Sequence, residues 1–189
     1  KPKITKKIKN FFNKFLPGIF SSGVTQINIL VGTIIASFQS GAVSYLYYAE
    51  RIYQINLAVA GIAVGTVSLP VLSKAFKQKN SLQVSSIQNK SIELSLLFSL
   101  PASLGLIIAS DEIVNGLFGY GSFTAKDVDM TSNALSFFAY GIIAFSFVKI
   151  LSNFFFARDN TKTPFYISFF SVITNVFISL VFFKEYGFI

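Results

Sequence analysis

Long apolar stretches without a single charge alternate with short polar segments along this 189-residue chain. No charged residue occurs between Lys14 and Glu50, between Arg51 and Lys74, between Asp129 and Lys149, or between Lys162 and Lys184. A run of about 18 or more apolar residues is long enough to cross a bilayer as a helix. A soluble protein would need polar faces at the helical period on such helices, and these stretches hold only scattered Ser, Thr, Asn and Gln. The pattern therefore predicts membrane-spanning helices.

The predicted fold is all-α: a polytopic transmembrane bundle of five helices, preceded by a short basic amphipathic helix. We place the spans at residues 19–38, 43–72, 91–110, 131–157 and 165–183. The second and fourth are longer than a perpendicular crossing needs, so they are expected to tilt or to project beyond the hydrocarbon. The first residue is Lys, no signal-peptide layout is present, and the number of spans is odd. We therefore expect the natural chain to continue beyond both ends.

Residues 1–16, KPKITKKIKNFFNKFL, form the predicted basic segment. Six lysines accompany Ile and Phe side chains that recur at helical spacing, which is typical of an amphipathic helix on an anionic membrane surface. The alternative is a juxtamembrane charge cluster that fixes orientation, and the sequence leaves both open. A nucleic-acid partner is not expected, because no folded basic face follows the segment.

The composition narrows the possible chemistry. Hydrophobic residues make up 52% and charged residues 13%, against roughly 25% charged in a soluble domain. The chain has no Cys and no His, which excludes disulfide scaffolds, thiolate chemistry, serine triads and the usual zinc sites. We expect no metal and no cofactor.

The loop charges predict the orientation. Lys residues are concentrated in residues 1–16 and in the loop after the second span, and Arg158 and Lys162 follow the fourth. With five spans these regions share one side, whereas the loop at 111–130 on the other side is mainly acidic. Because short cytoplasmic loops collect Lys and Arg, the N-terminus is predicted to be cytoplasmic.

The strongest candidate site is the pair Glu50 and Arg51 inside the second span, since an ionised group at membrane depth is costly unless it faces protein or water. One helical stripe contains Tyr47, Glu50, Arg51, Gln54, Ala58, Gly61 and Gly65. Such a stripe can line an aqueous cavity in which Arg51 offers a fork of donors to a phosphate. Alternatively, Glu50 and Arg51 are interfacial anchors and the glycines serve helix packing.

Three other positions have mainly structural interpretations. Lys149 lies eight residues before the end of the fourth span and is expected to anchor the helix by extending toward the positive side. Thr124 is predicted to cap the helix that Ala125 begins. Pro164 suits the first turn of the last helix.

Four segments, in this order and spacing, resemble the MurJ/MviN family of lipid II flippases: YYAERI (47–52), AVGTVSLPVLSKAF (63–76), LFGYGSFTAKD (117–127) and RDNTKTP (158–164). The resemblance covers residues from about 17 to the end. Family members have two six-helix lobes of the type found in the multidrug/oligosaccharidyl-lipid/polysaccharide exporter superfamily. The resemblance places this chain at spans seven to eleven, most of the second lobe, in a bacterial inner membrane.

The resemblance implies transport of lipid II, the lipid-linked disaccharide-pentapeptide precursor of peptidoglycan, to the outer leaflet by alternating access, with no bond made or broken. Arg51 matches the cavity arginine of the second lobe, so it is expected to contact the pyrophosphate or sugar headgroup, with Glu50 setting its position or a proton-linked step. Tyr47 and Gln54 complete the expected substrate-binding set. Three further arginines of the family belong to the first lobe, which is expected as a partner.

Some family members bind sodium between the seventh, eleventh and twelfth spans. Asn175 matches one ligand position, but the acidic ligands fall at Val31 or Gly32 and at Ser179. Hard cations favour several oxygen ligands, usually including carboxylate. We therefore expect no sodium site of that kind.

Other functions remain possible on sequence alone. The chain resembles, less specifically, flippases for other lipid-linked polysaccharides and drug exporters of the same superfamily. A non-transporting membrane scaffold of cell-wall synthesis would not need Arg51 to face water. An enzyme is the least favoured, because no second carboxylate or metal cluster accompanies Glu50.

Overall fold

The computed structural model describes residue 23 and residues 26–186, with side chains described as far as Val181. All regular secondary structure in this part is helical, as predicted. The chain divides into two compact units, Gly41–Ala157 and a second unit made of Lys1–Ser40 and Arg158–Ile189. The predicted basic helix at 1–16 and the first part of the span at 19–38 lie outside the described residues.

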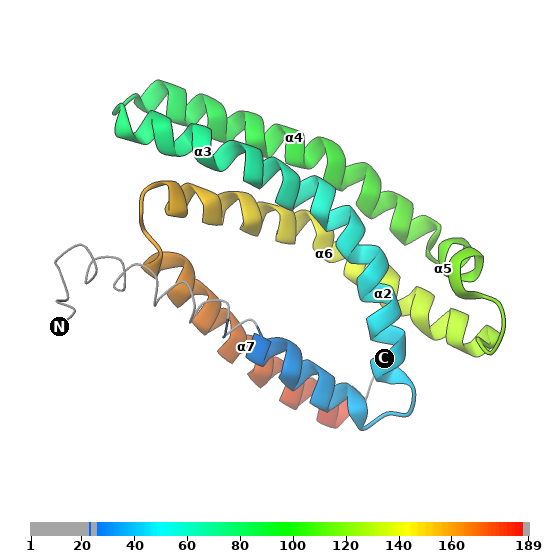
Figure 1. Ribbon diagram of the computed structural model, residues 1–189. Coiled ribbons are helices and arrows are strands. Elements are labelled where there is room, and N and C mark those ends of the chain that lie inside the picture. Colours follow the sequence, from blue (N-terminus) through cyan, green and yellow to red (C-terminus); the bar gives the residue numbers. More distant parts are fainter. Residues whose placement is uncertain (1–22, 24–25, 187–189) are drawn as a thin grey trace, which may run out of the picture. The chain divides into compact units, whose positions relative to one another are not determined.

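The larger unit begins with one continuous helix in three segments. These are α2 (Ala42–Leu57), the π-helical segment η1 (Ala58–Ala63) and α3 (Val64–Lys77). Together they form a 36-residue apolar helix, which is long enough to cross a membrane and to project from it. The helix bends along its length (Figure 1), and π-turns inside α-helices often mark functional positions.

A tight turn joins α3 to α4 (Ser81–Ile108). The backbone N–H of Asn80 donates to the carbonyl of Ala75 at 3.2 Å, Lys79 has a left-handed φ of 54°, and the Asn80 side chain accepts from the N–H of Gln83 at 3.0 Å. This pairs a Schellman-type helix end with an Asn N-cap. The helix therefore begins at Ser81 rather than near 91, because capping and not hydrophobicity sets its start.

The predicted acidic loop at 111–130 contains the short helix α5 (Ser110–Phe118). It is followed by α6 (Ala125–Ala157). The predicted Thr124 cap is confirmed: Thr124 Oγ1 accepts from the N–H of Asp127 at 3.3 Å, and the Asp127 carboxylate accepts from the N–H of Thr124 at 2.7 Å. The two residues cap the start of α6 reciprocally.

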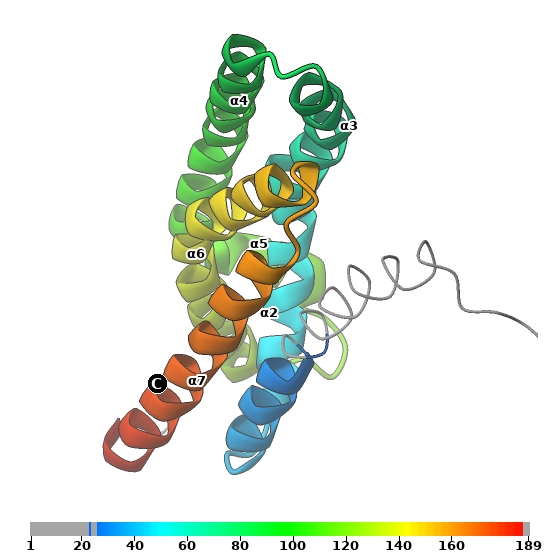
Figure 2. The same ribbon diagram turned by 90° about the vertical axis from the view of Figure 1, so that its left-hand side faces the viewer.

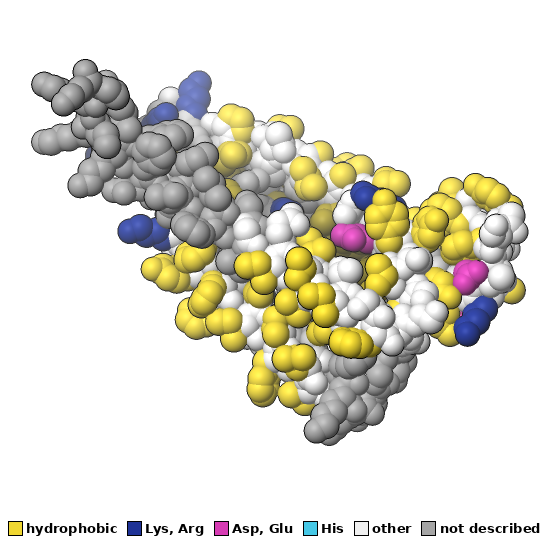
Figure 3. All heavy atoms as spheres, turned by 60° about the horizontal axis from the view of Figure 1, so that its bottom comes forward, with side chains coloured by type: hydrophobic (Ala, Val, Ile, Leu, Met, Phe, Trp, Pro, Cys, Tyr) yellow, Lys and Arg dark blue, Asp and Glu magenta, His cyan; other side chains and the backbone are white. Residues whose placement is uncertain are grey.

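Helix α6 packs against both the α2–η1–α3 helix and α4, as Figures 1 and 2 show. Every fourth residue of α4 from Ser91 to Ser103 is a buried serine, and Ser103 Oγ donates to the carbonyl of Ala139 on α6 at 2.8 Å. Small residues allow membrane helices to approach closely. Large apolar side chains remain exposed on the other faces. In Figure 3, many apolar side chains and few charged ones are visible on the described part of the surface. Such a surface suits a lipid environment.

The second unit contains, among its described residues, a helix at Gln26–Ser37 and α7 (Lys162–Tyr186). Asn160 Oδ1 accepts from the N–H of Thr163 at 3.2 Å, and Pro164 lies in the first turn of α7, as predicted. Four helices of the described chain are long and apolar enough to cross a membrane. The helix at Gln26–Ser37 is shorter than a span, and the rest of the predicted first span is not described.

Candidate functional site

The four predicted site residues form two hydrogen-bonded pairs along α2. Arg51 Nη2 donates to Tyr47 Oη at 3.0 Å, and its guanidinium carbon lies 4.6 Å from the centre of the Tyr47 ring. Gln54 Nε2 donates to Glu50 Oε1 at 2.9 Å. Within the described chain Glu50 and Arg51 form no ion pair, so Tyr47, and not Glu50, holds the guanidinium. Each pair is one helical turn apart, as side-chain neighbours on a helix must be.

The guanidinium of Arg51 is exposed on a long helix that is mainly apolar. Arg51, Tyr47 and Gln54 are exposed, and Glu50 is partly buried. The next exposed side chains along the helix are Ile55, Ala58 and Val59. A guanidinium held by one partner keeps several N–H donors free, and its planar fork fits phosphate or carboxylate oxygens. The site can therefore bind an anionic group, and its donors are arranged for a bidentate contact.

The π-helical segment η1 interrupts the predicted stripe. Ala58 is exposed, but Gly61 and Gly65 are buried. A Cβ on Gly61 would lie 3.2 Å from the Cα of Ser146 on α6, and a Cβ on Gly65 would clash with the side-chain amide of Asn153. Of the two interpretations that the sequence left open for these glycines, the structure favours helix packing. The wider π-turn rotates the following residues, so the glycines face α6 and serve helix packing.

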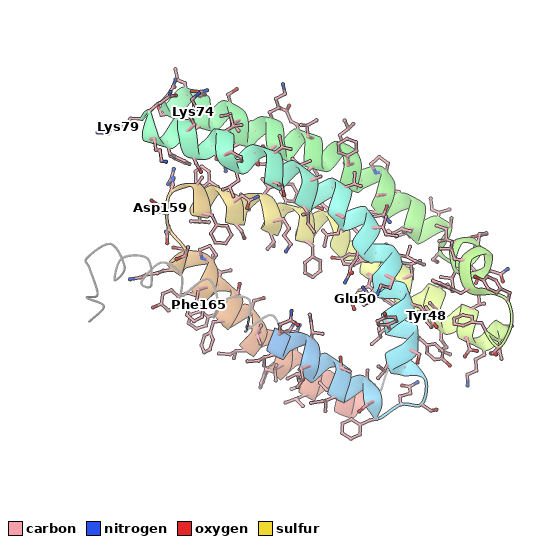
Figure 4. The ribbon with its side chains drawn as sticks, viewed as in Figure 1. Tyr48, Glu50, Lys74, Lys79, Asp159 and Phe165 are labelled. Atoms are coloured by element: carbon pink, nitrogen blue, oxygen red, sulfur yellow. The ribbon has the colours of Figure 1, made fainter. Side chains whose placement is uncertain are left out.

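Sequence reasoning missed how the start of α2 is fixed. Tyr45 Oη donates to Asp127 Oδ1 at 2.8 Å, which links α2 to the N-terminal cap of α6. The Tyr48 ring packs against Phe118 at 4.8 Å and Phe123 at 5.5 Å between ring centres. In Figure 4, Tyr48 and Glu50 project from different sides of α2. The spacing of the tyrosines in α2 is visible in the sequence, but the residues that they contact lie about 70 to 80 positions further along the chain.

The positions matched to sodium ligands show a different contact. Ser179 Oγ donates to Asn175 Oδ1 at 3.0 Å, so the amide oxygen already has a partner. Among residues 23 and 26–186, no three His, Cys, Asp or Glu side chains cluster in a way that could hold a metal ion. That this chain lacks a sodium site stays a prediction.

Known proteins resemble the whole chain. The profile of the family described as "Lipid II flippase MurJ" matches residues 1–189. A probable lipid II flippase MurJ of Rhizobium meliloti is 40% identical over 185 residues, which are 98% of this chain and 35% of the relative. One from Rickettsia prowazekii is 41% identical over 174 residues, covering 92% of this chain and 34% of the relative.

A solved structure, "Lipid II flippase MurJ, inward closed conformation", matches with a TM-score of 0.82 and 31% identity, over 99% of this chain and 40% of that one. The chain spans about a third of the length of the curated relatives it matches. The matching fold, the membrane-spanning helices and the family profile agree with one another. This chain is therefore a multi-pass membrane protein segment that belongs to the lipid II flippase MurJ family.

Proposed function

We propose that this chain is most of the second lobe of a transporter that moves lipid II from the inner to the outer leaflet by alternating access, without covalent chemistry. The relatives are about three times as long as the chain, so a first lobe from the rest of the protein would complete the path. Lipid II joins a long apolar chain to a polar headgroup through a pyrophosphate. The polar part is costly in hydrocarbon and needs a protein surface that binds it during the crossing.

The observation that supports this role most directly is the exposed guanidinium of Arg51 on a 36-residue apolar helix. An unpaired cation at membrane depth is tolerated where it meets water or a bound anion. We infer that Arg51 binds the pyrophosphate through two N–H donors while Tyr47 fixes the plane of the guanidinium. Gln54 and Glu50, bonded to each other, would then contact the sugar or peptide.

The proposed orientation follows from the charges at the two ends of the larger unit. Lys74 and Lys79 lie at the α3–α4 turn, with Lys77 between them (Figure 4). The opposite end, at α5, has Asp111 and Glu112 in its first turn. The positive end is therefore assigned to the cytoplasm of a bacterial inner membrane. Residues 1–16 would then contact anionic lipids on that same side.

The first experiment is complementation of a strain depleted of its lipid II flippase by the full-length protein, together with a direct measurement of lipid II translocation. Arg51→Ala is expected to lower translocation at least tenfold at normal membrane levels, because a charge-assisted contact is worth about 1.5–3 kcal/mol. Arg51→Lys keeps the charge but loses the fork, so it should recover only part of the activity. Tyr47→Phe tests the bond that holds the guanidinium.

The outcomes separate the candidate functions. Failure of a well-expressed wild type to move lipid II would point to another lipid-linked polysaccharide or a drug as the substrate. Normal translocation by Arg51→Ala would indicate that Arg51 is an interfacial anchor and does not bind the substrate.

A scaffold role is tested by the reaction of Arg51→Cys with a water-soluble thiol reagent. Leu104→Cys is the matched control. The contacts of Ser103 with Ala139 and of Tyr53 with Phe138 place Leu104 of α4 close to the depth of Arg51, and its side chain is exposed. Reaction at 51 but not at 104 supports a water-filled cavity at Arg51, and complete protection of both favours a scaffold.

A further inference from the structure

Lys149 is a second exposed cation inside a membrane-spanning helix of the larger unit. It lies on α6, and within the described chain it forms no hydrogen bond or ion pair. It is eight residues from the end of α6 at Ala157, or about 12 Å at 1.5 Å per residue. Phe154, Phe155 and Phe156 occupy the helix between Lys149 and that end. An ammonium group that reached for the membrane surface would have to pass this aromatic segment.

The surroundings of Lys149 are defined by its neighbours on α6. Ser146 packs beneath Gly61, and the Asn153 amide lies where a side chain on Gly65 would be. Lys149 is one turn from both residues, so it lies beside the seam between α6 and the η1–α3 helix. Lys149 is exposed, so its ammonium group is accessible beside this seam.

Asn153 adds donors next to this cation. Its side-chain amide forms no hydrogen bond in the part of the chain that the structure describes, and it is partly exposed. Gly65 gives it room against the backbone of α3. An ammonium group and an amide on adjacent turns, beside a helix face with glycine at positions 61 and 65, supply the donors that phosphate oxygens need.

The first exposed cation, Arg51, lies on α2, which packs against α6 together with η1. The pairs Tyr53–Phe138 and Gly61–Ser146 show that α2 and η1 run alongside α6 in the same direction. On this register Lys149 lies about 13 residues further along α6 than the level of Arg51, which is about 20 Å at 1.5 Å per residue. The two exposed cations are therefore separate positions on one lobe, at two depths.

We propose that Lys149, with Asn153, forms a second anion-binding position that takes the pyrophosphate of the lipid-linked substrate on the cytoplasmic side of Arg51. This inference rests on the proposed function and extends it to a path with two phosphate positions. A headgroup that moves between them crosses about 20 Å of a hydrocarbon layer about 30 Å thick. The headgroup leaves Lys149 only when Arg51 is within reach of the pyrophosphate, or after the protein has changed conformation.

The test uses the full-length protein with Lys149→Gln and Lys149→Arg, and with Lys126→Gln as the control on the same helix near its other end. Binding of lipid II to purified protein and translocation in vesicles are measured at matched protein amounts. Lys149→Gln should weaken lipid II binding about tenfold, as expected for loss of one charge-assisted contact. Lys149→Arg should retain most of the affinity, and Lys126→Gln should match the wild type. Binding of phosphatidylglycerol, measured in parallel, should not change.

A second measurement reports the position directly. Cysteine at 149 should react with a membrane-impermeant thiol reagent added from the cytoplasmic side and should be protected by lipid II. The adjacent Val148→Cys, also exposed but about a quarter-turn away, should not gain protection.

The inference is overturned if Lys149→Gln binds and moves lipid II as the wild type does, or if it only lowers the amount of protein in the membrane, as an anchor would. It is also overturned if the loss is in phosphatidylglycerol binding alone. A wild type that does not move lipid II contradicts the proposed function instead.

Discussion

The contact between η1 and α6 gives a sharp test of the packing. Gly61 is buried, and a Cβ added to it would lie 3.2 Å from the Cα of Ser146 and 3.4 Å from a methyl group of Leu57. The first of these neighbours is backbone, so a change of rotamer cannot relieve the contact. Gly61→Ala must therefore separate the two helices slightly or distort the π-turn.

The expected magnitude follows from two opposing effects. Overpacking a tight contact costs about 1–3 kcal/mol, and replacing Gly by Ala within a helix returns about 0.5–1 kcal/mol of backbone entropy. With central values of about 2 kcal/mol for the cost and about 0.75 kcal/mol for the gain, the expected net loss is about 1 kcal/mol. Gly105→Ala in α4 is the matched control, because beyond the helix's own nearby backbone no atom of the described residues lies within 4 Å of a Cβ added there. It should be neutral or stabilising.

The assay is chemical unfolding of the detergent-solubilised full-length protein, with the free energy of unfolding compared among wild type, Gly61→Ala and Gly105→Ala. A stability of Gly61→Ala equal to the wild type, or raised as in Gly105→Ala, would refute the idea that the glycine is needed for close approach. A loss of stability in both variants would instead indicate a general effect of alanine on this protein.

Two further predictions concern polar contacts between helices. Ser103→Ala should lower the free energy of unfolding by about 1 kcal/mol through loss of the hydrogen bond to the carbonyl of Ala139. Ser99→Ala should cost nothing, because the buried Ser99 hydroxyl has no partner among the described residues; equal losses would contradict the assignment. Tyr45→Phe and Asp127→Asn should each lower the free energy of unfolding, because each loosens the link between α2 and α6. If the two residues interact, the double variant should lose less stability than the sum of the two single losses. Strict additivity in this double-mutant cycle would rule out the coupling.

Much of the fold could be predicted from the sequence because the signals were local. Long apolar stretches with few or no charges located the long helices. The Thr124 cap and the position of Pro164 followed from chemistry within a few residues. The start of α4 was placed too late, since Asn80 caps a helix whose first turns are polar and resemble a loop in a hydrophobicity pattern. The short helix α5 was missed because its first turn is also polar, with Asp111 and Glu112, and resembles a loop in a hydrophobicity pattern.

The candidate site was predicted only in part. Tyr47, Glu50, Arg51 and Gln54 were correctly expected to be neighbours because they lie within two helical turns, where spacing determines contact. Their role in substrate binding stays a prediction. Their pairing differed from expectation, as Arg51 is held by Tyr47 and Glu50 by Gln54. Side-chain rotamers select among neighbours at three and four residues, and the sequence does not specify that choice.

The sequence by itself determined the class of protein, the long helices and the polar positions of α2, because each depends on composition and on contacts along a single helix. Only the tertiary structure decided that Gly61 and Gly65 face α6 and that Tyr45 reaches Asp127. An ideal helical period cannot anticipate the π-turn of η1, which rotates every residue after it. Contacts between residues about 80 positions apart depend on how the helices pack, and no local pattern encodes them.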